Sequence, residues 1–451
     1  MIKRFMYIPL QYNRSVIEKS KEHVENSYSF KRIEHADLFF ELSNRQLEKI
    51  QGDFILEYCL CIAIAEAYEA DTVIIPIDIE YLKQQTTSIN TYLKCLKILA
   101  SIGTLKKINV LFPGFDEHFC EEIDKDYLGD LLSRPIIKST LNIYSGGLDC
   151  TVASAYLESE KIPQHYIFYD YGQNNIKEEK FCIEKQCLSR KINSLNMIMD
   201  SELKSFFEHI KFSTGLLSNK KITLKNKEDE YVPFRNSLFL AYALNFSNTA
   251  KLDITHIITG SHMDDINSPD NNYEYYNIWN NLLKLNKNNN DIRILPILFK
   301  FGGKKEVVKL GYELNVDFSQ TWTCHNQSLY GDKLVQCGNC NDCKVRERAF
   351  EDNKLVDPLL EAGRISDSDM KYIDLIVELI NKIKKKDASE NVSVNKTLEE
   401  MGFDSLMAIH FVTLLEDVLD IEIDGEYLID FSSKNLIEIN CLVNKVKLEY
   451  E

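Results

Sequence analysis

The chain has 451 residues, of which 44% are hydrophobic, so it is long enough for two or three domains with apolar cores. Its formal net charge of −16 argues against a nucleic-acid partner, because polynucleotide-binding proteins usually present a basic face. The N-terminus leads into no apolar segment of the length of a signal peptide or a membrane span. Most of the 12 cysteines are scattered, as in a reduced protein. We therefore expect a cytoplasmic protein with no membrane partner.

Residues 1–135 alternate between strand-like and helical patterns. Three runs have the apolar, β-branched character of strands: Phe5–Leu10, Thr72–Ile77 and Ile108–Phe112. Helical periodicity appears in Ile50–Ala70 and Ile79–Ile102. The alternation predicts an N-terminal α/β domain, but no group of residues in it has recognisable chemistry. A substrate lid, a docking surface and an element that pairs two copies into a homodimer are all open roles for it.

From residue 136 the alternation of strands and helices becomes regular. Four runs are predicted strands: Ile136–Tyr144, His165–Tyr169, Ser194–Met199 and Ile254–Gly260. This alternation predicts an α/β domain over residues 136–358, with a parallel sheet and helices on both of its faces. Ligands of such sheets bind at the carboxyl ends of the strands.

The first of these strands leads into a small-residue turn that opens a helix. The sequence of the turn is Tyr144-Ser145-Gly146-Gly147-Leu148-Asp149-Cys150-Thr151. Exposed backbone N–H groups and the positive end of the helix dipole make such a turn a seat for phosphate, and glycine lets the backbone approach closely. The pattern is typical of the pyrophosphate loop (PP-loop) of ATP-pyrophosphatase enzymes. We assign these residues to ATP binding, together with Gly260 at the end of the fourth strand. An ordinary glycine turn before a helix is the alternative.

Four cysteines have the spacing of a metal site. Cys324 precedes Cys337, Cys340 and Cys343, and the last three form two overlapping Cys-x-x-Cys units. Four thiolates make a closed tetrahedral site for Zn²⁺ with no open position, so we expect a structural zinc knuckle. Redox-active thiols or an iron–sulfur cluster are the alternatives.

Six motifs follow one another through the middle of the chain: Ser145–Asp149; Tyr171-Gly172-Gln173; Val232–Asn236; Leu295–Ile297 with Lys304 and Glu306; Thr321–Cys324; and Cys337–Cys343 with Arg346. Together they make residues 138–352 similar to 7-cyano-7-deazaguanine synthase, the queuosine-pathway enzyme that converts a carboxylate to a nitrile. The resemblance implies an adenine nucleotide alpha hydrolase-like fold. It also implies an ATP-dependent C–N ligase or nitrile synthase that activates a carboxylate and releases pyrophosphate and AMP.

The resemblance further implies roles for single residues. The PP-loop would bind the departing pyrophosphate, and Asp149 would help to hold Mg²⁺. Arg235 and Lys304 would offset the charge that builds up on the phosphates, so Asp149, Arg235 and Lys304 are the predicted catalytic residues. A role as surface salt-bridge partners is the alternative for Arg235 and Lys304. Gln173 and Asp270 are the predicted substrate contacts.

Two segments depart from the family pattern. Asn174 and Asn175 stand where the family carries basic and His residues after Tyr-Gly-Gln. The stretch Asn267–Asn272 keeps the Pro-Asp of a Tyr-Pro-Asp-Cys-Arg-like segment and lacks its Cys and Arg. The nucleotide-binding motifs are thus kept while those that face the base are altered, which predicts a changed substrate. Retained deazaguanine chemistry in a nucleobase-linked modification or defence system is the alternative.

Residues 366–451 predict a small, acidic, four-helix module. They hold 9 Lys and Arg against 19 Asp and Glu. Gly402-Phe403-Asp404-Ser405-Leu406 opens a predicted helix that runs to Leu419, with Ile409, Val412, Leu415 and Leu419 on one apolar stripe. This motif resembles the attachment site of acyl and peptidyl carrier proteins. The resemblance implies that a phosphopantetheinyl transferase adds 4′-phosphopantetheine to Ser405. The alternative is a helical interaction domain in which Asp404-Ser405 is only an N-cap.

The two resemblances combine into one predicted function. A carboxylate, either free or held on the arm at Ser405, is activated by ATP and converted by ammonia to an amide or a nitrile. Tethering favours this because it raises the effective concentration of the substrate. A thioamide product and a non-catalytic, nucleotide-sensing scaffold are the alternatives.

Overall fold

The computed structural model describes most of the chain. The described residues are 5–7, 54–112, 121–192, 197–209, 215–217, 230–326, 329–330, 333–359, 372–384, 397–428 and 431–447, apart from 76, 78, 201, 290, 339, 400, 435, 437, 438, 441, 444 and 445. The chain divides into two compact units. The first comprises Met1–His325 and Asn339–Leu355, and the second comprises Asn326–Gly338 and Val356–Glu451. None of the described helices is long and apolar enough to span a membrane.

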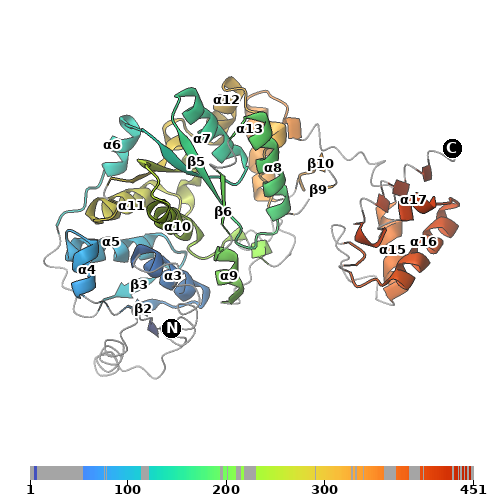
Figure 1. Ribbon diagram of the computed structural model, residues 1–451, viewed down its shortest axis with the longest axis horizontal. Coiled ribbons are helices and arrows are strands. Elements are labelled where there is room, and N and C mark those ends of the chain that lie inside the picture. Colours follow the sequence, from blue (N-terminus) through green and yellow to red (C-terminus); the bar gives the residue numbers. More distant parts are fainter. Residues whose placement is uncertain are drawn as a thin grey trace. The chain divides into compact units, whose positions relative to one another are not determined.

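A five-stranded parallel sheet forms the centre of the first unit (Figure 1). Its strands are β4 (Thr140–Ile143), β5 (Gln164–Tyr169), β6 (Met197–Asp200), β7 (His256–Thr259) and β8 (Arg293–Pro296). They lie in the order β6-β5-β4-β7-β8, so the chain moves outward from β4 in one direction and then restarts on its other side. The order reverses between β4 and β7, and a crevice at such a reversal is where parallel sheets bind ligands. The four predicted strands are confirmed.

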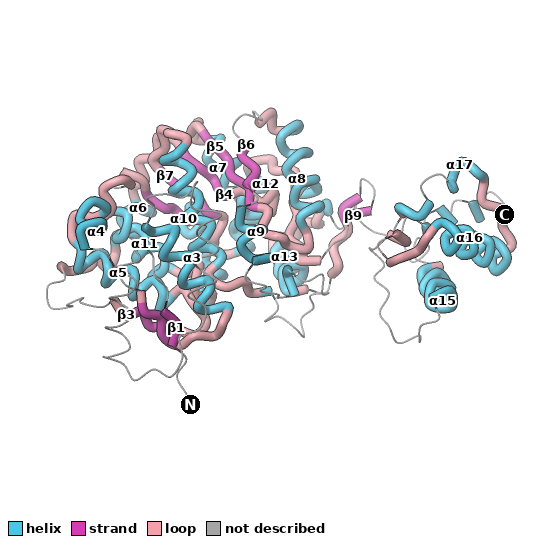
Figure 2. The backbone as a smooth tube through the Cα atoms, turned by 60° about the horizontal axis from the view of Figure 1, so that its bottom comes forward, coloured by secondary structure: helices cyan, strands magenta, loops and turns pink. Residues whose placement is uncertain are grey.

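Helices cover both faces of this sheet, as Figures 1 and 2 show. On one face lie α7 (Leu148–Ser159), α8 (Ile176–Ser189), α12 (Lys304–Glu313) and α13 (Asn341–Asp352). On the other face lie α10 (Arg235–Thr249) and α11 (Tyr273–Leu285). Two short helices, α6 (Tyr127–Ser133) and α9 (Glu202–His209), complete the unit. The predicted α/β fold with a parallel sheet is therefore confirmed.

The described part of residues 1–135 is grouped with the first unit, and its boundary as a separate domain stays a prediction. Its three-stranded parallel sheet consists of β1 (Phe5–Tyr7), β2 (Thr72–Ile74) and β3 (Asn109–Leu111). Besides α6, its helices are α3 (Phe54–Ala67), α4 (Ile79–Gln85) and α5 (Ile89–Ile102).

The composition of α3 gives the physical reason. Every residue from Phe54 to Glu66 is buried, and a helix that is apolar on all sides needs neighbours on all sides. The helix packs on β2 and on α10, while α5 packs on β3 and on α11. The small sheet and the helices of the central sheet therefore enclose the N-terminal helices between them.

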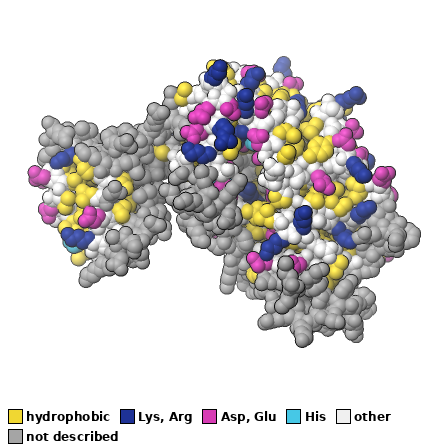
Figure 3. Space-filling model, turned by 180° about the vertical axis from the view of Figure 1, so that it is seen from behind, with side chains coloured by type: hydrophobic (Ala, Val, Ile, Leu, Met, Phe, Trp, Pro, Cys, Tyr) yellow, Lys and Arg dark blue, Asp and Glu magenta, His cyan; other side chains and the backbone are white. Residues whose placement is uncertain are grey.

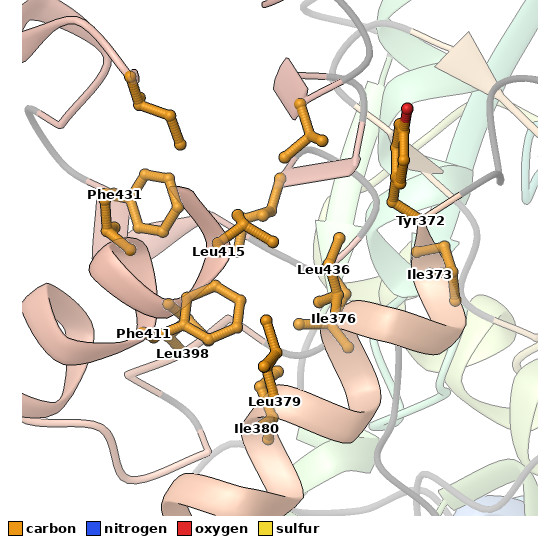
Figure 4. Close-up of a cluster of buried hydrophobic side chains, with 14 of the residues drawn as sticks. Tyr372, Ile373, Ile376, Leu379, Ile380, Leu398, Phe411, Leu415, Phe431 and Leu436 are labelled. Atoms are coloured by element: carbon orange, nitrogen blue, oxygen red, sulfur yellow. The ribbon is translucent and has the colours of Figure 1, made fainter. Parts of the chain in front are cut away.

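The second unit contains a small helical core (Figure 4). Its elements are α15 (Ile373–Lys384), α16 (Ser405–Leu419), α17 (Gly425–Leu428) and a 3₁₀ turn at Phe431–Ser433. Their apolar side chains meet in the core, where Ile376, Ile380, Phe411 and Leu415 are fully buried. The described residues between 436 and 447 are helical as well, which suits the last helix of the predicted four-helix module.

Candidate active site

The PP-loop lies between β4 and α7, at the point where the strand order reverses. Gly146 has φ of 70°, a left-handed conformation that favours glycine. Gly147 is the N-cap of α7, and its carbonyl accepts a hydrogen bond of 2.6 Å from Thr151 Oγ1. Cys150 is buried and donates to the same carbonyl at 3.3 Å. The loop is thus fixed by its own side chains and presents the amino end of a 12-residue helix.

Gly260 lies against this loop from the end of β7. A Cβ atom at residue 260 would lie 2.9 Å from the backbone nitrogen of Cys150 and 3.3 Å from Asp149 Cβ. The structure thus brings Gly260 against the loop, and this close approach is possible because glycine has no side chain; the role of Gly260 in ATP binding stays a prediction.

Asp149 and Lys304 form an ion pair at the mouth of the loop. Lys304 Nζ lies 2.8 and 2.6 Å from the two carboxylate oxygens of Asp149. Lys304 is 6% exposed, so it is not a surface salt-bridge partner. His262 Nε2 lies 3.7 Å from Asp149 as well, and His262 Nδ1 lies 3.8 Å from Asp265 Oδ2. A carboxylate that lines the cavity next to a phosphate seat has the donor atoms that Mg²⁺ prefers, which suits the predicted role of Asp149.

A cavity of about 220 Å³ opens beside the loop. Residues of the PP-loop, of β5 and of the segments around residues 171–179, 235–239 and 322–342 line it: Ile143, Tyr144, Ser145, Gly147, Leu148, Asp149, Ile167, Phe168, Tyr169, Tyr171, Gln173, Asn175, Glu179, Arg235, Phe239, Trp322, Thr323, His325 and Asp342. Two donors at the cavity, Arg235 Nε and Trp322 Nε1, are buried with no hydrogen-bond acceptor among the described residues. Buried donors of this kind suit a polar ligand that supplies the acceptor.

Arg235 occupies one wall of the cavity. Its Nη1 donates to Tyr171 Oη at 3.2 Å, and its guanidinium carbon lies 5.6 Å from the centre of the Tyr171 ring. Phe239 lies below the same guanidinium, at 6.0 Å. Aromatic faces hold a guanidinium in place without neutralising it, so Arg235 keeps its charge for an anionic ligand.

The cavity also holds an acid that the sequence did not single out, Glu179. Gln173 Nε2 donates to its Oε2 at 2.8 Å, and Asn175 Nδ2 donates to its Oε1 at 3.3 Å. Burial raises the pKa of Glu179 to about 7, although Gln173, Arg235 and His325 act to lower it. The predicted substrate residue Gln173 thus lines the cavity and binds Glu179 there. Gln173 and Glu179 are six residues apart, and no sequence motif links two residues at that spacing, so the sequence does not indicate their contact.

The second predicted substrate residue, Asp270, is not among the described residues that line this cavity. It is 6% exposed, and its backbone carbonyl accepts from Asn236 Nδ2 at 3.3 Å. Burial raises the pKa of Asp270 to about 6, and the charge of Arg235 acts in the opposite direction. The structure therefore places Asp270 next to Asn236, the residue after Arg235, and a role in substrate contact stays a prediction.

The four predicted metal ligands come together. The Sγ atoms of Cys324, Cys337, Cys340 and Cys343 lie within 4.8 Å of one another, and those of Cys324 and Cys340 are 3.9 Å apart. Thiolates around one tetrahedral Zn²⁺ are about 3.8 Å apart for the usual zinc–sulfur distance. Asn326 Nδ2 donates to Cys337 Sγ at 3.2 Å, which suits a thiolate. These residues fit zinc and would hold it as a closed, structural site.

A charged triad adjoins the zinc ligands, and two of its members, His325 and Asp342, line the cavity. His325 lies between two carboxylates, with Nε2 at 3.1 Å from Asp342 and Nδ1 at 3.6 Å from Glu230. Burial acts to raise the pKa of Asp342, but the imidazole of His325 outweighs burial, and this pKa falls to about 2. Sequence motifs pointed to the neighbouring cysteines but not to this triad, because Glu230 is distant in the chain.

Ser405 occupies the first turn of α16 in the second unit. Asp404 is the N-cap and accepts from the backbone nitrogen of Met407 at 2.8 Å, which leaves the exposed Ser405 outside the cap. The apolar residues beside it on α16 are exposed as well, Leu406 at 80% and Ile409 at 66%. Figure 3 shows hydrophobic side chains gathered on the face of this unit that is turned to the viewer. Of the residues on the predicted apolar stripe, Val412 and Leu415 are buried, whereas Ile409 is exposed among the described residues.

Comparisons with known proteins agree with this geometry. Residues 139–354 match the family model described as Queuosine biosynthesis protein QueC, and residues 374–436 match the model described as Phosphopantetheine attachment site. The chain is 29% identical over 230 residues to 7-cyano-7-deazaguanine synthase of Thermoplasma volcanium, which covers 49% of this chain and 90% of that protein. It is 28% identical over 235 residues to the synthase of Methanococcus aeolicus, covering 48% and 96%. Both predicted resemblances are confirmed: the chain contains a QueC domain and a phosphopantetheine attachment domain.

Proposed function

We propose that this protein activates a carboxylate with ATP and converts it to an amide or a nitrile, on a substrate that its own carrier domain holds at Ser405. The observation that carries the proposal is the presence in one chain of a QueC domain and a phosphopantetheine attachment domain. The carrier domain has no evident use for an enzyme that acts only on a free nucleobase. Its presence therefore favours a tethered substrate.

The proposed reaction begins with adenylation. A carboxylate is a poor acyl donor because its leaving group would be oxide. Attack of the carboxylate on the α-phosphorus of ATP forms an acyl-adenylate and expels pyrophosphate. The backbone of the PP-loop and the amino end of α7 would bind this pyrophosphate. Lys304 and Arg235 would stabilise the charge that develops during the transfer. Mg²⁺, if held by Asp149, supplies a Lewis acid at the phosphates.

Ammonia then completes the conversion. Its nitrogen attacks the acyl carbon, AMP leaves, and one proton is released as the amide forms. A second adenylation on the amide oxygen, followed by loss of AMP and a proton, gives the nitrile. Glu179 lines the cavity, and burial raises its pKa to about 7, so it is suited to accept these protons. We assign that role to Glu179.

The carrier domain restricts the substrate class. The phosphopantetheine arm would supply a flexible thiol that carries an acyl group to the cavity. An acyl group that is attached through one carboxyl has no carboxylate left at that end. The activated carboxylate must therefore be a second one in the same group, as in a dicarboxylic or acidic amino acid.

The relatives support a second candidate function, synthesis of a nitrile or amide on a deazaguanine-type base. Identity of 28–29% with 7-cyano-7-deazaguanine synthases favours it. The stretch Asn267–Asn272 disfavours it, because the Cys and Arg of the corresponding family segment are absent. Pyrophosphate release with 7-carboxy-7-deazaguanine, at equal rates in wild type and Ser405→Ala, would establish this function in place of the tethered reaction.

The tethered reaction is tested on full-length protein whose arm carries candidate dicarboxylic acyl groups. We expect ATP and ammonia to change the mass of the arm by exchange of OH for NH₂, and by further loss of water for a nitrile. Asp149→Asn should abolish both the mass change and pyrophosphate release. Unchanged pyrophosphate release by Asp149→Asn would contradict the assignment of the loop.

A further inference from the structure

The residues before the QueC match contact the segment that carries Arg235. The match begins at residue 139, so neither family model assigns a role to α3 and α5. In the structure α3 packs on α10, whose first residue is Arg235, and α5 packs on α11. The residues that immediately precede α10, Tyr231 to Phe234, lie against both N-terminal helices at two points.

The first point is Glu66, near the end of α3. Tyr231 Oη lies 3.0 and 2.9 Å from its two carboxylate oxygens, so the hydroxyl donates to both. The backbone nitrogen of Leu105 donates to Glu66 Oε1 at 2.7 Å. Glu66 is 7% exposed, and a buried carboxylate is found where donors hold it. The contact joins residues that are 165 positions apart in the chain.

The second point is Gly103, directly after α5. A Cβ atom at residue 103 would lie 2.9 Å from the ring of Phe234. Phe234 is 0% exposed and has φ of 49°, a left-handed conformation that is uncommon for a residue with a side chain. Such a conformation persists only where the surroundings determine it. Gly103 provides the space that the ring of Phe234 occupies.

Arg235 comes directly after this strained residue. Its guanidinium lines the cavity and bonds Tyr171, as described above. A change in the backbone at Phe234 moves the start of α10 and therefore the guanidinium. The hydrogen bonds from Glu66 to Tyr231 and the backbone from Tyr231 through Phe234 to Arg235 thus form a continuous link.

We propose that Glu66 is a positioning residue, which holds Arg235 at the cavity through Tyr231 and the left-handed Phe234. Residues 54–112 are then part of the scaffold of the active site, in addition to any role as a lid or docking surface. The functional part of this inference rests on the proposed role of Arg235 at the phosphates, whereas the structural part does not. Displacement of a charged group by about 1 Å costs roughly a hundredfold in rate, so the contact has a measurable effect.

The test compares Glu66→Gln and Tyr231→Phe in the full chain with a matched control, Glu69→Gln. Glu69 lies three residues further on, and its exposed carboxylate pairs with Lys106 at 3.4 Å. We expect the first two variants to weaken ATP binding or pyrophosphate release about tenfold to a hundredfold, with the control unchanged. Backbone hydrogen exchange over residues 231–235 should become faster in both variants and stay slow in the control.

A double variant separates positioning from general loss of stability. If Glu66 acts through Arg235, then Glu66→Gln causes no further loss when Arg235 is already alanine. Full, additive losses in Glu66→Gln/Arg235→Ala would overturn the inference, and so would unchanged hydrogen exchange over residues 231–235 in Tyr231→Phe. Hydrogen exchange requires no substrate. If the wild type releases no pyrophosphate with any carboxylate, the proposed function fails while this measurement still decides the structural contact.

Discussion

The contact between Gly260 and the PP-loop predicts that Gly260→Ala impairs nucleotide binding. The added methyl would lie 2.9 Å from the backbone nitrogen of Cys150, and ordinary contacts begin at 3.4 Å. The loop or the end of β7 must therefore shift by about 0.5 Å. The backbone at Gly260 is not in the left-handed region, so alanine adopts it without torsional strain, and the effect is steric.

The atom that must move is the backbone nitrogen of Cys150, which belongs to the PP-loop itself. A displacement of about half an ångström in a phosphate seat should weaken ATP binding by roughly tenfold to a hundredfold, which is about 1.4–2.7 kcal/mol. Isothermal titration of the full chain with ATP measures it. Gly425→Ala is the matched control, because nothing lies within 4 Å of a Cβ atom there and the position is in the second unit. Equal affinity of Gly260→Ala and the wild type would refute the assignment of this loop to phosphate.

Three further predictions concern the metal, the ion pair and a buried acid. The wild type should contain one zinc per chain by plasma mass spectrometry, Cys340→Ser should contain less, and a chelator should unfold the protein; a chelated protein that stays folded and loses only activity would contradict a structural site. Lys304→Met leaves Asp149 without its cation and should lower the free energy of unfolding by about 3 kcal/mol, which is the low end for a buried pair because the Asp149 side chain is 25% exposed. Thermal melting measures this loss of stability. A loss no larger than that of the surface variant Lys309→Met would refute the prediction. Burial raises the pKa of Glu179 to about 7 from an ordinary value of 4.5, so its ionisation destabilises the fold as the pH rises through 7. Glu179→Gln, which stays neutral, should therefore gain in melting temperature relative to the wild type between pH 5 and 8, and a difference that is constant with pH would contradict this.

The features that the sequence predicted are those that short segments encode. The PP-loop, the last three zinc cysteines and the Ser405 motif are each contiguous, and the parallel sheet follows from the regular alternation of apolar runs. Lys304 and Asp149 were both singled out, but only the structure shows that they form a buried pair across 155 residues.

The features that were missed depend on contacts between distant segments. Glu66 and Tyr231 meet across 165 residues, and neither stands in a motif that indicates the contact. The mostly apolar character of Phe54–Ala67 is a signal that this helix is enclosed on all sides. The exposure of Ile409 could not be predicted for a different reason. An apolar stripe identifies residues on one face of a helix, but it does not show whether a neighbour covers each of them.

The central claim is that one chain both carries and modifies its substrate, and its first requirement is an arm on Ser405. The most direct measurement is the intact mass of full-length protein produced with a broad-specificity phosphopantetheinyl transferase. We predict a gain of about 340 Da, the mass of one phosphopantetheine group, in the wild type and no gain in Ser405→Ala. A wild type that gains no mass under these conditions would contradict the claim.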